Sequence, residues 1–216
     1  MHHDLKSPLT SIISVPQLLL LADNLDEHQR EMLKRVEDAG YTLLAQVNLS
    51  TTLFKMERGS YQLAPEEFDL LPLVRKILAG QEDAVDMRRL VVRVLVGGLE
   101  AGLETEFPVR AEELLCHSML ANLILNALEA SPEGGEVRIE LSRGPEEVRI
   151  AVQNQGAVPL DVRERFFEKY ATSGKTRGTG LGTYSARLIA QAHGGDIAMR
   201  TDEVTGTVVI STLPGA

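Results

Sequence analysis

The 216-residue sequence contains one cysteine, Cys116, no tryptophan, five phenylalanines and four tyrosines. A single cysteine excludes a disulfide framework and a cluster of thiolate metal ligands, and it is typical of a reducing compartment. The scarcity of aromatic side chains disfavours a surface that binds single-stranded nucleic acid by stacking. No stretch of 18 consecutive apolar residues is present, and the first residues lack the pattern of a secretory signal. The sequence therefore predicts a cytoplasmic chain without membrane contact of its own.

The charge balance also narrows the possible partners. The chain carries 22 Lys and Arg residues against 31 Asp and Glu residues, a net charge of -9. Domains that bind duplex nucleic acid normally have a basic excess, so nucleic acid is not an expected partner. The hydrophobic share of 44% and the charged share of 25% are typical of soluble proteins with one or two domains.

Residues 1–58 are predicted to form a helical hairpin. The segment Asp23–Asp26 is a turn that ends in a candidate N-cap, with a long helix predicted on each side of it. In the second helix, apolar or small residues recur at alternating steps of three and four: Met32, Val36, Ala39, Leu43, Val47, Ser50 and Phe54. A two-helix hairpin cannot bury such a stripe by itself, so we expect two copies to form a four-helix bundle in a homodimer.

Residues 59–216 show a different pattern, in which strands alternate with helices. The predicted strands are 91–96, 137–141, 148–152 and 208–212, and the predicted helices are 70–78, 112–130 and 181–193. Strands separated by helices predict an α/β sandwich, so the fold class of the whole chain is α+β. The segment Glu57–Ser60 is the expected linker.

The first candidate for chemistry is the segment from His3 to Leu9, with the sequence HDLKSPL. The imidazole of His3 is a neutral nucleophile near neutral pH, and the adjacent Asp4 can hold its tautomer or accept its proton. Ser7 follows one helical turn later. The alternative interpretation is a remnant of an affinity tag or a frayed terminus.

The second candidate is the pair Asn122 and Asn126. Because these residues are four apart on a predicted helix, both amides project from one face. Hard oxygen ligands of this kind suit a hydrated Mg²⁺ ion that bridges phosphate oxygens. The alternative interpretation is two asparagines that face solvent or cap the helix.

Two glycine-containing segments complete the set. In the first, Asn154 ends a predicted strand as a candidate acceptor for an exocyclic amine, and Gly156 permits a flat base to approach the backbone. The second segment runs from Gly174 to Gly182 directly into a helix, where free N–H groups favour phosphate, and it adds the cations of Lys175 and Arg177. Taken alone, the first segment has the alternative interpretation of a strand that ends in an ordinary turn, and the second that of a flexible loop that ends in a helix cap.

In their order and spacing, these segments resemble the catalytic core of a two-component sensor histidine kinase over essentially the whole chain. The matching motifs are the phosphoacceptor box at 3–9, the asparagine box at 122–130, the first glycine box at 154–156, the phenylalanine box at 166–170, the second glycine box at 178–182, the turn at 192–195 and the closing strand at 206–214.

The resemblance implies an ATP site between the asparagine box and a lid over residues 157–179. Asn126 is then the Mg²⁺ ligand, with Asn122 beside it. Asn154 stands where the family has an aspartate that accepts a hydrogen bond from the adenine amine, so the charge assistance of that bond is lost. The other residues implied in nucleotide binding are Gly156, Lys175, Arg177, Gly178, Thr179, Gly180, Leu181, Gly182 and Thr207.

The resemblance further implies that His3 attacks the γ-phosphate of ATP, with Asp4 as its base or orienting group. Ser7 stands where the family positions phosphatase chemistry. The phosphoryl group then passes to an aspartate of a response-regulator receiver domain that docks against the bundle. The sequence is expected to be part of a longer protein whose sensor segments lie upstream and can be membrane-anchored.

Two other functions stay open on the sequence. One is a degenerate core that dimerises, binds ATP and docks a receiver without phosphorylating itself, and Asn154 is the feature that favours it. The other is a general ATPase of the gyrase, Hsp90 and histidine kinase group. It is disfavoured because Asn122 occupies the position of the glutamate that activates water in that group.

Overall fold

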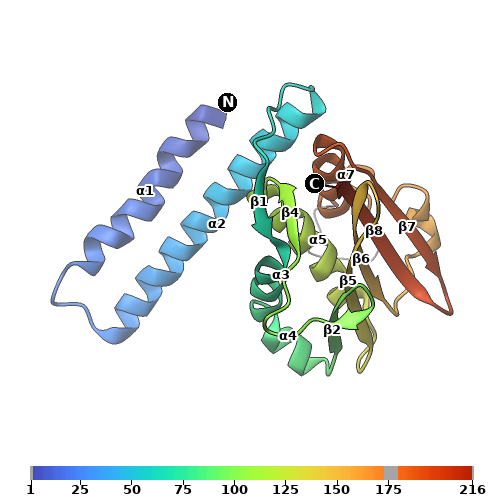
Figure 1. Ribbon diagram of the computed structural model, residues 1–216. Coiled ribbons are helices and arrows are strands. Elements are labelled where there is room, and N and C mark those ends of the chain that lie inside the picture. Colours follow the sequence, from blue (N-terminus) through green and yellow to red (C-terminus); the bar gives the residue numbers. More distant parts are fainter. Residues whose placement is uncertain (1, 173–179, 216) are drawn as a thin grey trace. The chain divides into compact units, whose positions relative to one another are not determined.

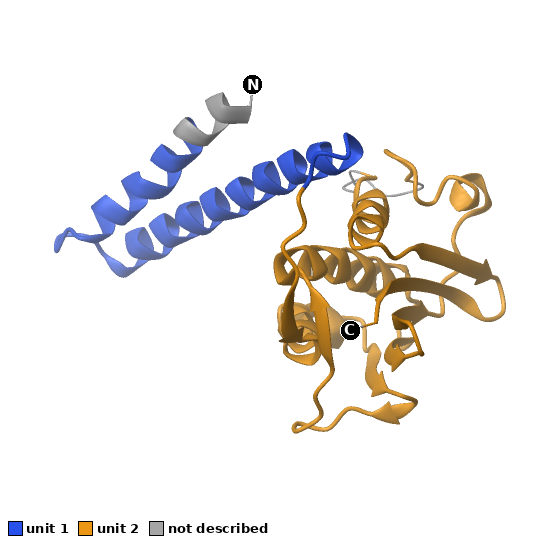
Figure 2. Cartoon of the chain, turned by 45° about the horizontal axis from the view of Figure 1, so that its top comes forward, with its two compact units in different colours: residues 1–61 blue, residues 62–216 orange. Residues whose placement is uncertain are grey.

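The computed structural model describes residues 2–172 and 180–215, and the side chains of the residues from 8 onward within these ranges. The chain divides into two compact units, Met1–Tyr61 and Gln62–Ala216 (Figure 2). Each unit is described separately below.

The first unit is a helical hairpin of α1 (His2–Leu20) and α2 (Glu27–Glu57), as predicted (Figure 1). Asp26 caps α2: its Oδ1 accepts from the backbone N–H of Gln29 at 2.7 Å, and the Gln29 side chain accepts from the Asp26 N–H at 3.0 Å. This reciprocal pair satisfies two donors that the first helical turn leaves unpaired. The turn predicted at residues 23–26 is therefore confirmed.

The two helices pack closely because a glycine lies at their contact. Gly40 is buried in the middle of α2, and a Cβ atom built there would lie 2.7 Å from Cγ1 of Ile13.

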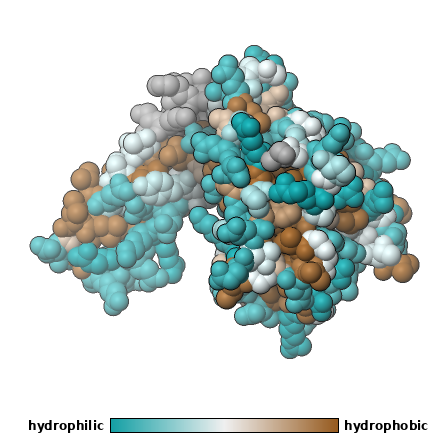
Figure 3. All heavy atoms as spheres, viewed as in Figure 1, coloured by the Kyte–Doolittle hydropathy of each residue, from teal (hydrophilic) through white to brown (hydrophobic). Residues whose placement is uncertain are grey.

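Much of the apolar stripe of the hairpin remains exposed, as the brown spheres on that unit show (Figure 3). The exposed members are Ile12, Val15, Leu18, Leu19, Leu21, Met32, Val36, Leu43 and Phe54. Among the helices of residues 2–172 and 180–215, none combines the length and the apolar character needed to cross a membrane.

The second unit begins with a small antiparallel sheet of β1 (Glu66–Asp69) and β4 (Pro108–Ala111). Asp69 ends β1 and caps the next helix, α3 (Leu70–Ala79). Its Oδ1 accepts from the N–H groups of Leu71 at 3.1 Å and Phe107 at 2.8 Å. One carboxylate thus fixes both the start of α3 and the entry into β4. The short helix α4 (Glu82–Met87) follows α3.

The main sheet has six strands in the order β3-β2-β5-β6-β8-β7. The strands are β2 (Val91–Val96), β3 (Leu99–Glu100), β5 (Glu136–Arg143), β6 (Glu147–Asn154), β7 (Ile197–Asp202) and β8 (Gly206–Pro214). The pair β2–β5 is parallel and the other pairs are antiparallel. All four strands predicted from the sequence are present, whereas β1, β3, β4 and β7 were not predicted.

Helices cover one face of this sheet, which makes a two-layer α/β sandwich (Figure 1). The covering helices are α3, α5 (Glu113–Ala130) and α7 (Gly182–Ala192); α6 (Leu160–Arg163) is a short helix between β6 and α7. Burial alternates along β5, β6 and β8, so one set of side chains faces the helices while the other is more exposed. The predicted fold class, a helical hairpin followed by an α/β sandwich, is confirmed.

Cys116 and His193 are two buried residues that lie in this core. Cys116 on α5 is fully buried, and burial, aided by the nearby Glu112 and Glu113, raises the pKa of its thiol to about 12. His193 follows α7, and its Nε2 accepts from the Glu112 N–H at 3.0 Å. Its Nδ1 therefore carries the proton and donates to the Ile189 carbonyl at 2.8 Å. Both residues serve the packing of α5 against its neighbours.

Ser211 on β8 carries a stability cost. Its Oγ is the one buried side-chain polar atom in the described residues without a hydrogen-bond partner. A buried hydroxyl that makes no hydrogen bond costs about 1–3 kcal/mol. Ser211→Ala is therefore expected to raise the free energy of unfolding by about 1 kcal/mol, measured by urea denaturation. Ser131→Ala is the matched control: it removes a buried hydroxyl that donates to the Ala127 carbonyl at 2.8 Å, and should lower stability by about 1 kcal/mol. A loss of stability in Ser211→Ala would contradict this assignment.

Candidate functional site

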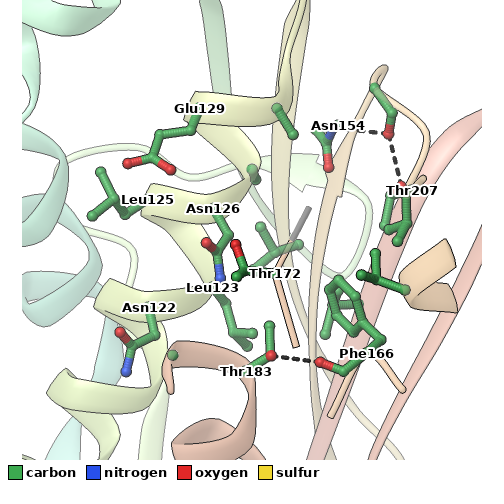
Figure 4. A pocket seen from close by; sticks show the side chains of 18 of the residues that line it. Asn122, Leu123, Leu125, Asn126, Glu129, Asn154, Phe166, Thr172, Thr183 and Thr207 are labelled. Atoms are coloured by element: carbon green, nitrogen blue, oxygen red, sulfur yellow. Dashed lines mark hydrogen bonds between the residues drawn. The ribbon is translucent and has the colours of Figure 1, made fainter. Parts of the chain in front are cut away.

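The second unit contains a cavity of about 330 Å³ between α5 and the end of the sheet at β6 and β8 (Figure 4). This volume lies at the lower end of the range for small-ligand pockets. Its polar lining comes from separate parts of the chain: Asn122, Asn126, Glu129, Asn154, Thr172, Thr183 and Thr207. Apolar side chains, among them Val152, Val158, Val162 and Phe166, line the rest.

One wall of the cavity is the polar face of α5. Asn122, Asn126 and Glu129 follow each other at steps of four and three, so they share this face (Figure 4). On the other faces of α5, Leu120, Ile124 and Leu128 are buried in the core. Amide and carboxylate oxygens on one helical face are hard ligands of the kind that Mg²⁺ binds together with phosphate oxygens and water.

The start of α7 lies against Asn122. The Nδ2 of Asn122 donates to Ser185 Oγ at 3.1 Å, and this hydroxyl donates to the Gly182 carbonyl at 2.8 Å. A Cβ atom at Gly182 would lie 3.2 Å from Asn122 Oδ1 and 3.6 Å from Asn126 Nδ2. Glycine at this position therefore leaves the space beside both amides open. The free N–H groups and the positive dipole end of α7 border the cavity on this side.

The other end of the cavity is built around Gly156. Asn154 is 5% exposed, and its Nδ2 donates to the Gly156 carbonyl at 3.1 Å. The Thr207 hydroxyl donates to the same carbonyl at 2.7 Å. A Cβ atom at Gly156 would lie 2.0 Å from the Ala130 carbonyl oxygen, so the last residue of α5 and this turn touch through their backbones. The close approach requires glycine.

Arg88, between α4 and β2, holds the end of α5. Its guanidinium donates from Nη1 to the carbonyls of Leu128 at 2.6 Å and Glu129 at 3.2 Å, and from Nη2 to the carbonyl of Ser131. These carbonyls have no partner within the helix, and their partial negative charge favours a cation. The last turn of α5, with Glu129, is thereby anchored.

The structure brings together seven of the residues named from the sequence. Asn122, Asn126, Asn154, Gly156, Gly180, Gly182 and Thr207 all line the cavity. Leu181 is not among the lining residues and is the N-cap position of α7. Lys175, Arg177, Gly178 and Thr179 lie outside the described residues. His3, Asp4 and Ser7 belong to α1 in the first unit, and their side chains also lie outside the description.

Several lining residues were missed by the sequence analysis. Glu129 was detectable, because it comes three residues after Asn126 and therefore on the same helical face. Thr183 was not: its hydroxyl donates to the Phe166 carbonyl at 2.6 Å and joins α7 to a distant segment (Figure 4). Thr172 and the apolar wall depend on tertiary packing in the same way.

Comparison with known families assigns both parts of the chain. Residues 1–59 match the His Kinase A (phospho-acceptor) domain. Residues 111–216 match the family of histidine kinase-, DNA gyrase B-, and HSP90-like ATPases. The chain belongs to the sensor histidine kinases of two-component systems. The predicted family is therefore confirmed.

Known sensor proteins resemble the chain over nearly its whole length. The sensor protein DivL of Caulobacter vibrioides is 29% identical over 98% of this chain and 27% of its own length. The sensor histidine kinase WalK of Bacillus subtilis is 29% identical over 98% of this chain and 35% of its own length. The chain thus spans less than half of these curated relatives.

Solved structures show the same fold. The catalytic domain of the histidine kinase ThkA has a TM-score of 0.60 and 28% identity, and covers 70% of this chain and 96% of that domain. Full-length ShkA, solved in complex with AMPPNP, has a TM-score of 0.73 and 24% identity over the whole of this chain and 44% of ShkA. At that identity, the likeness to ShkA concerns the fold.

Proposed function

We propose that this chain phosphorylates itself on His3 with ATP and passes the phosphoryl group to an aspartate of a response-regulator receiver domain. The observation that carries the proposal is one cavity lined by Asn126 from α5, by Asn154 from β6, and by Gly182 at the start of α7. The apolar wall suits a nucleotide base, the helix N-terminus suits phosphate groups, and the amide oxygens suit the Mg²⁺ ion that accompanies them. The ATPase family match supports ATP as that nucleotide.

The two ends of the cavity suit different parts of ATP. Asn154, Gly156 and Thr207 offer hydrogen-bonding groups and a flat approach to the base. At the other end, the α7 N-terminus attracts phosphate oxygens, and we assign Lys175 and Arg177 to the same task. The Oδ1 of Asn126 would hold Mg²⁺, with Asn122 beside it. Mg²⁺ supplies neutralisation and orientation of the phosphate oxygens when bound.

His3 acts as the nucleophile in the proposed reaction. The unprotonated imidazole nitrogen forms a bond to the γ-phosphorus, while the bond to the β,γ-bridging oxygen breaks and ADP leaves. Asp4 orients the ring and accepts the proton from its other nitrogen. We assign Ser7 to phosphatase chemistry, which is separate from the transfer step. Two hairpins are proposed to associate through their exposed apolar stripes, and a structure of ThkA with the response regulator TrrA supports a receiver partner.

The test is incubation with Mg²⁺ and γ-labelled ATP, followed by measurement of acid-labile, base-stable label on the protein. We expect label on the chain and on His2→Gln, because the neighbouring histidine lies outside the phosphoacceptor motif. His3→Gln is expected to carry none. Label on His3→Gln would contradict the assignment of the acceptor. Transfer is then followed with a receiver domain and its Asp→Asn variant.

The second candidate function is a binding module that docks a receiver without phosphorylating itself, and the neutral Asn154 favours it. Mg-ATP should raise the melting temperature under either function, whereas Mg²⁺ alone should not. Stabilisation by Mg-ATP without any label on the protein would favour the binding module. Label that depends on His3 would exclude it.

A further inference from the structure

The first turn of α7 carries two buried hydroxyl groups, and each ties it to a different part of the second unit. The Thr183 hydroxyl donates to the Phe166 carbonyl at 2.6 Å. On the other side, Ser185, which is 2% exposed, contacts α5 through the Asn122 side chain. The position of Ser185 beside the polar face of α5 is therefore fixed from both sides.

Ser185 Oγ has one proton, and its two neighbours determine where this proton points. Oγ lies 2.8 Å from the Gly182 carbonyl oxygen and 3.1 Å from Asn122 Nδ2. A carbonyl oxygen only accepts, so Ser185 donates to Gly182 and accepts from Asn122. Turning the Asn122 amide by 180° would place its oxygen against Oγ, and one proton would then have to serve two acceptors. Ser185 therefore directly sets the orientation of the Asn122 amide.

The orientation of this amide depends on Ser185 alone. In the described part of the chain, the bond to Ser185 is the one hydrogen bond of the Asn122 side chain. The Asn122 Oδ1 lies beside Gly182, where an added Cβ atom would be 3.2 Å away, and both residues line the cavity. Asn126 lines the same cavity one helical turn later (Figure 4). Ser185 is absent from the lining, so it reaches a ligand only through Asn122.

We propose that Ser185 is a positioning residue that keeps the Asn122 oxygen available as an acceptor for a water molecule of the Mg²⁺ ion bound with the nucleotide. This inference rests on the proposed ATP site, in which Asn126 holds the ion. A water molecule on Mg²⁺ directs its hydrogen atoms away from the ion, so it needs an acceptor. The oriented Asn122 oxygen is such an acceptor, whereas a turned amide would present the N–H groups of Nδ2.

The experiment measures the dissociation constant of ADP by calorimetry, once in Mg²⁺ and once in EDTA. Ser185→Ala removes the hydroxyl and introduces the best helix former, so α7 is kept. We expect this variant to bind ADP about three- to tenfold more weakly in Mg²⁺, as for one lost hydrogen bond, and to stay within about twofold of the unmodified chain in EDTA. A merely structural role of Ser185 would weaken binding equally in both conditions, which would overturn the proposal.

A double-mutant cycle with Asn122→Ala gives a second comparison, made in Mg²⁺ alone. Because Ser185 acts through Asn122, Ser185→Ala should cost no more than about twofold in ADP affinity once residue 122 is alanine. Losses that add up in the double variant would overturn the proposal, and so would an unchanged affinity in Ser185→Ala.

Ser131→Ala is the matched control. Ser131 is 1% exposed and donates to a helical carbonyl, that of Ala127, as Ser185 does to Gly182. It lies outside the cavity lining, so its removal should leave the affinity for ADP in Mg²⁺ unchanged. An equal loss in this variant would overturn the proposal, whereas failure of ADP to bind the unmodified chain would contradict the proposed function.

Discussion

Gly156→Ala is expected to destabilise the second unit by about 3 kcal/mol or more and to abolish nucleotide binding. The added Cβ would lie 2.0 Å from the Ala130 carbonyl oxygen and 2.9 Å from its carbon, both backbone atoms that cannot rotate away. The turn must therefore move away from α5. It carries the carbonyl that receives the hydrogen bonds of Asn154 and Thr207, so the base end of the cavity moves with it. Urea denaturation and ADP titration measure the two effects.

Gly80→Ala is the matched control for that substitution. Gly80 ends α3 with φ −71°, a conformation that alanine also adopts, and the nearest atom to an added Cβ is 3.5 Å away. The change should alter stability by no more than about 0.5–1 kcal/mol, because it mainly restricts the unfolded chain. Unchanged ADP binding and stability in Gly156→Ala would mean that α5 and this turn are not in contact.

Arg88→Met is expected to lower the free energy of unfolding by about 2–3 kcal/mol. The half-buried guanidinium donates to three carbonyls at the end of α5, and methionine fills similar space without a donor. The carbonyls then lose their partners and the favourable charge at the helix end. Since Glu129 lies in that last turn, a weaker affinity for Mg-ADP is expected as well.

Arg149→Met makes the same chemical change at an exposed site. Arg149 on β6 pairs with Glu147 at 3.1 Å, with its side chain 53% exposed. Exposed pairs of this kind contribute about 0–1 kcal/mol, so this variant should stay close to the unmodified chain. Equal losses in the two variants would show that the end of α5 does not depend on Arg88.

The sequence predicted those elements whose pattern is local. The start of α2 follows from Asp26 and Gln29, which satisfy each other within four residues. The strands β2, β5, β6 and β8 are rich in β-branched residues and alternate in burial. By contrast, β1 has the sequence EEFD, and it exists because its partner β4, some forty residues away, pairs with it. No local signal reports such a partner.

The residues of the candidate site likewise include some that a local sequence pattern predicts and some that depend on distant parts of the chain. Asn122 and Asn126 were recognisable because their spacing places them on one helical face, and Asn154 because it ends a strand. The orientation of the Asn154 amide could not be predicted, because its Nδ2 donates to the Gly156 carbonyl, which also accepts from the Thr207 hydroxyl on a distant strand. Arg88 also gave no signal, because its partners are carbonyl groups, which every residue carries.

The position of β8 in the sheet determines when the strands of the second unit can pair during synthesis. β8 pairs with β6 on one side and β7 on the other, although it is synthesised after both. At roughly 5–20 residues per second, the ribosome takes about 3–12 s to pass from the end of β6 to the end of β8. During this interval β6 has an open edge, and Asn154 has been made without the strand that carries Thr207. The nucleotide cavity is incomplete until β8 supplies Thr207 and Val209 to its lining. ATP can therefore stabilise the nascent domain only once β8 has left the ribosome.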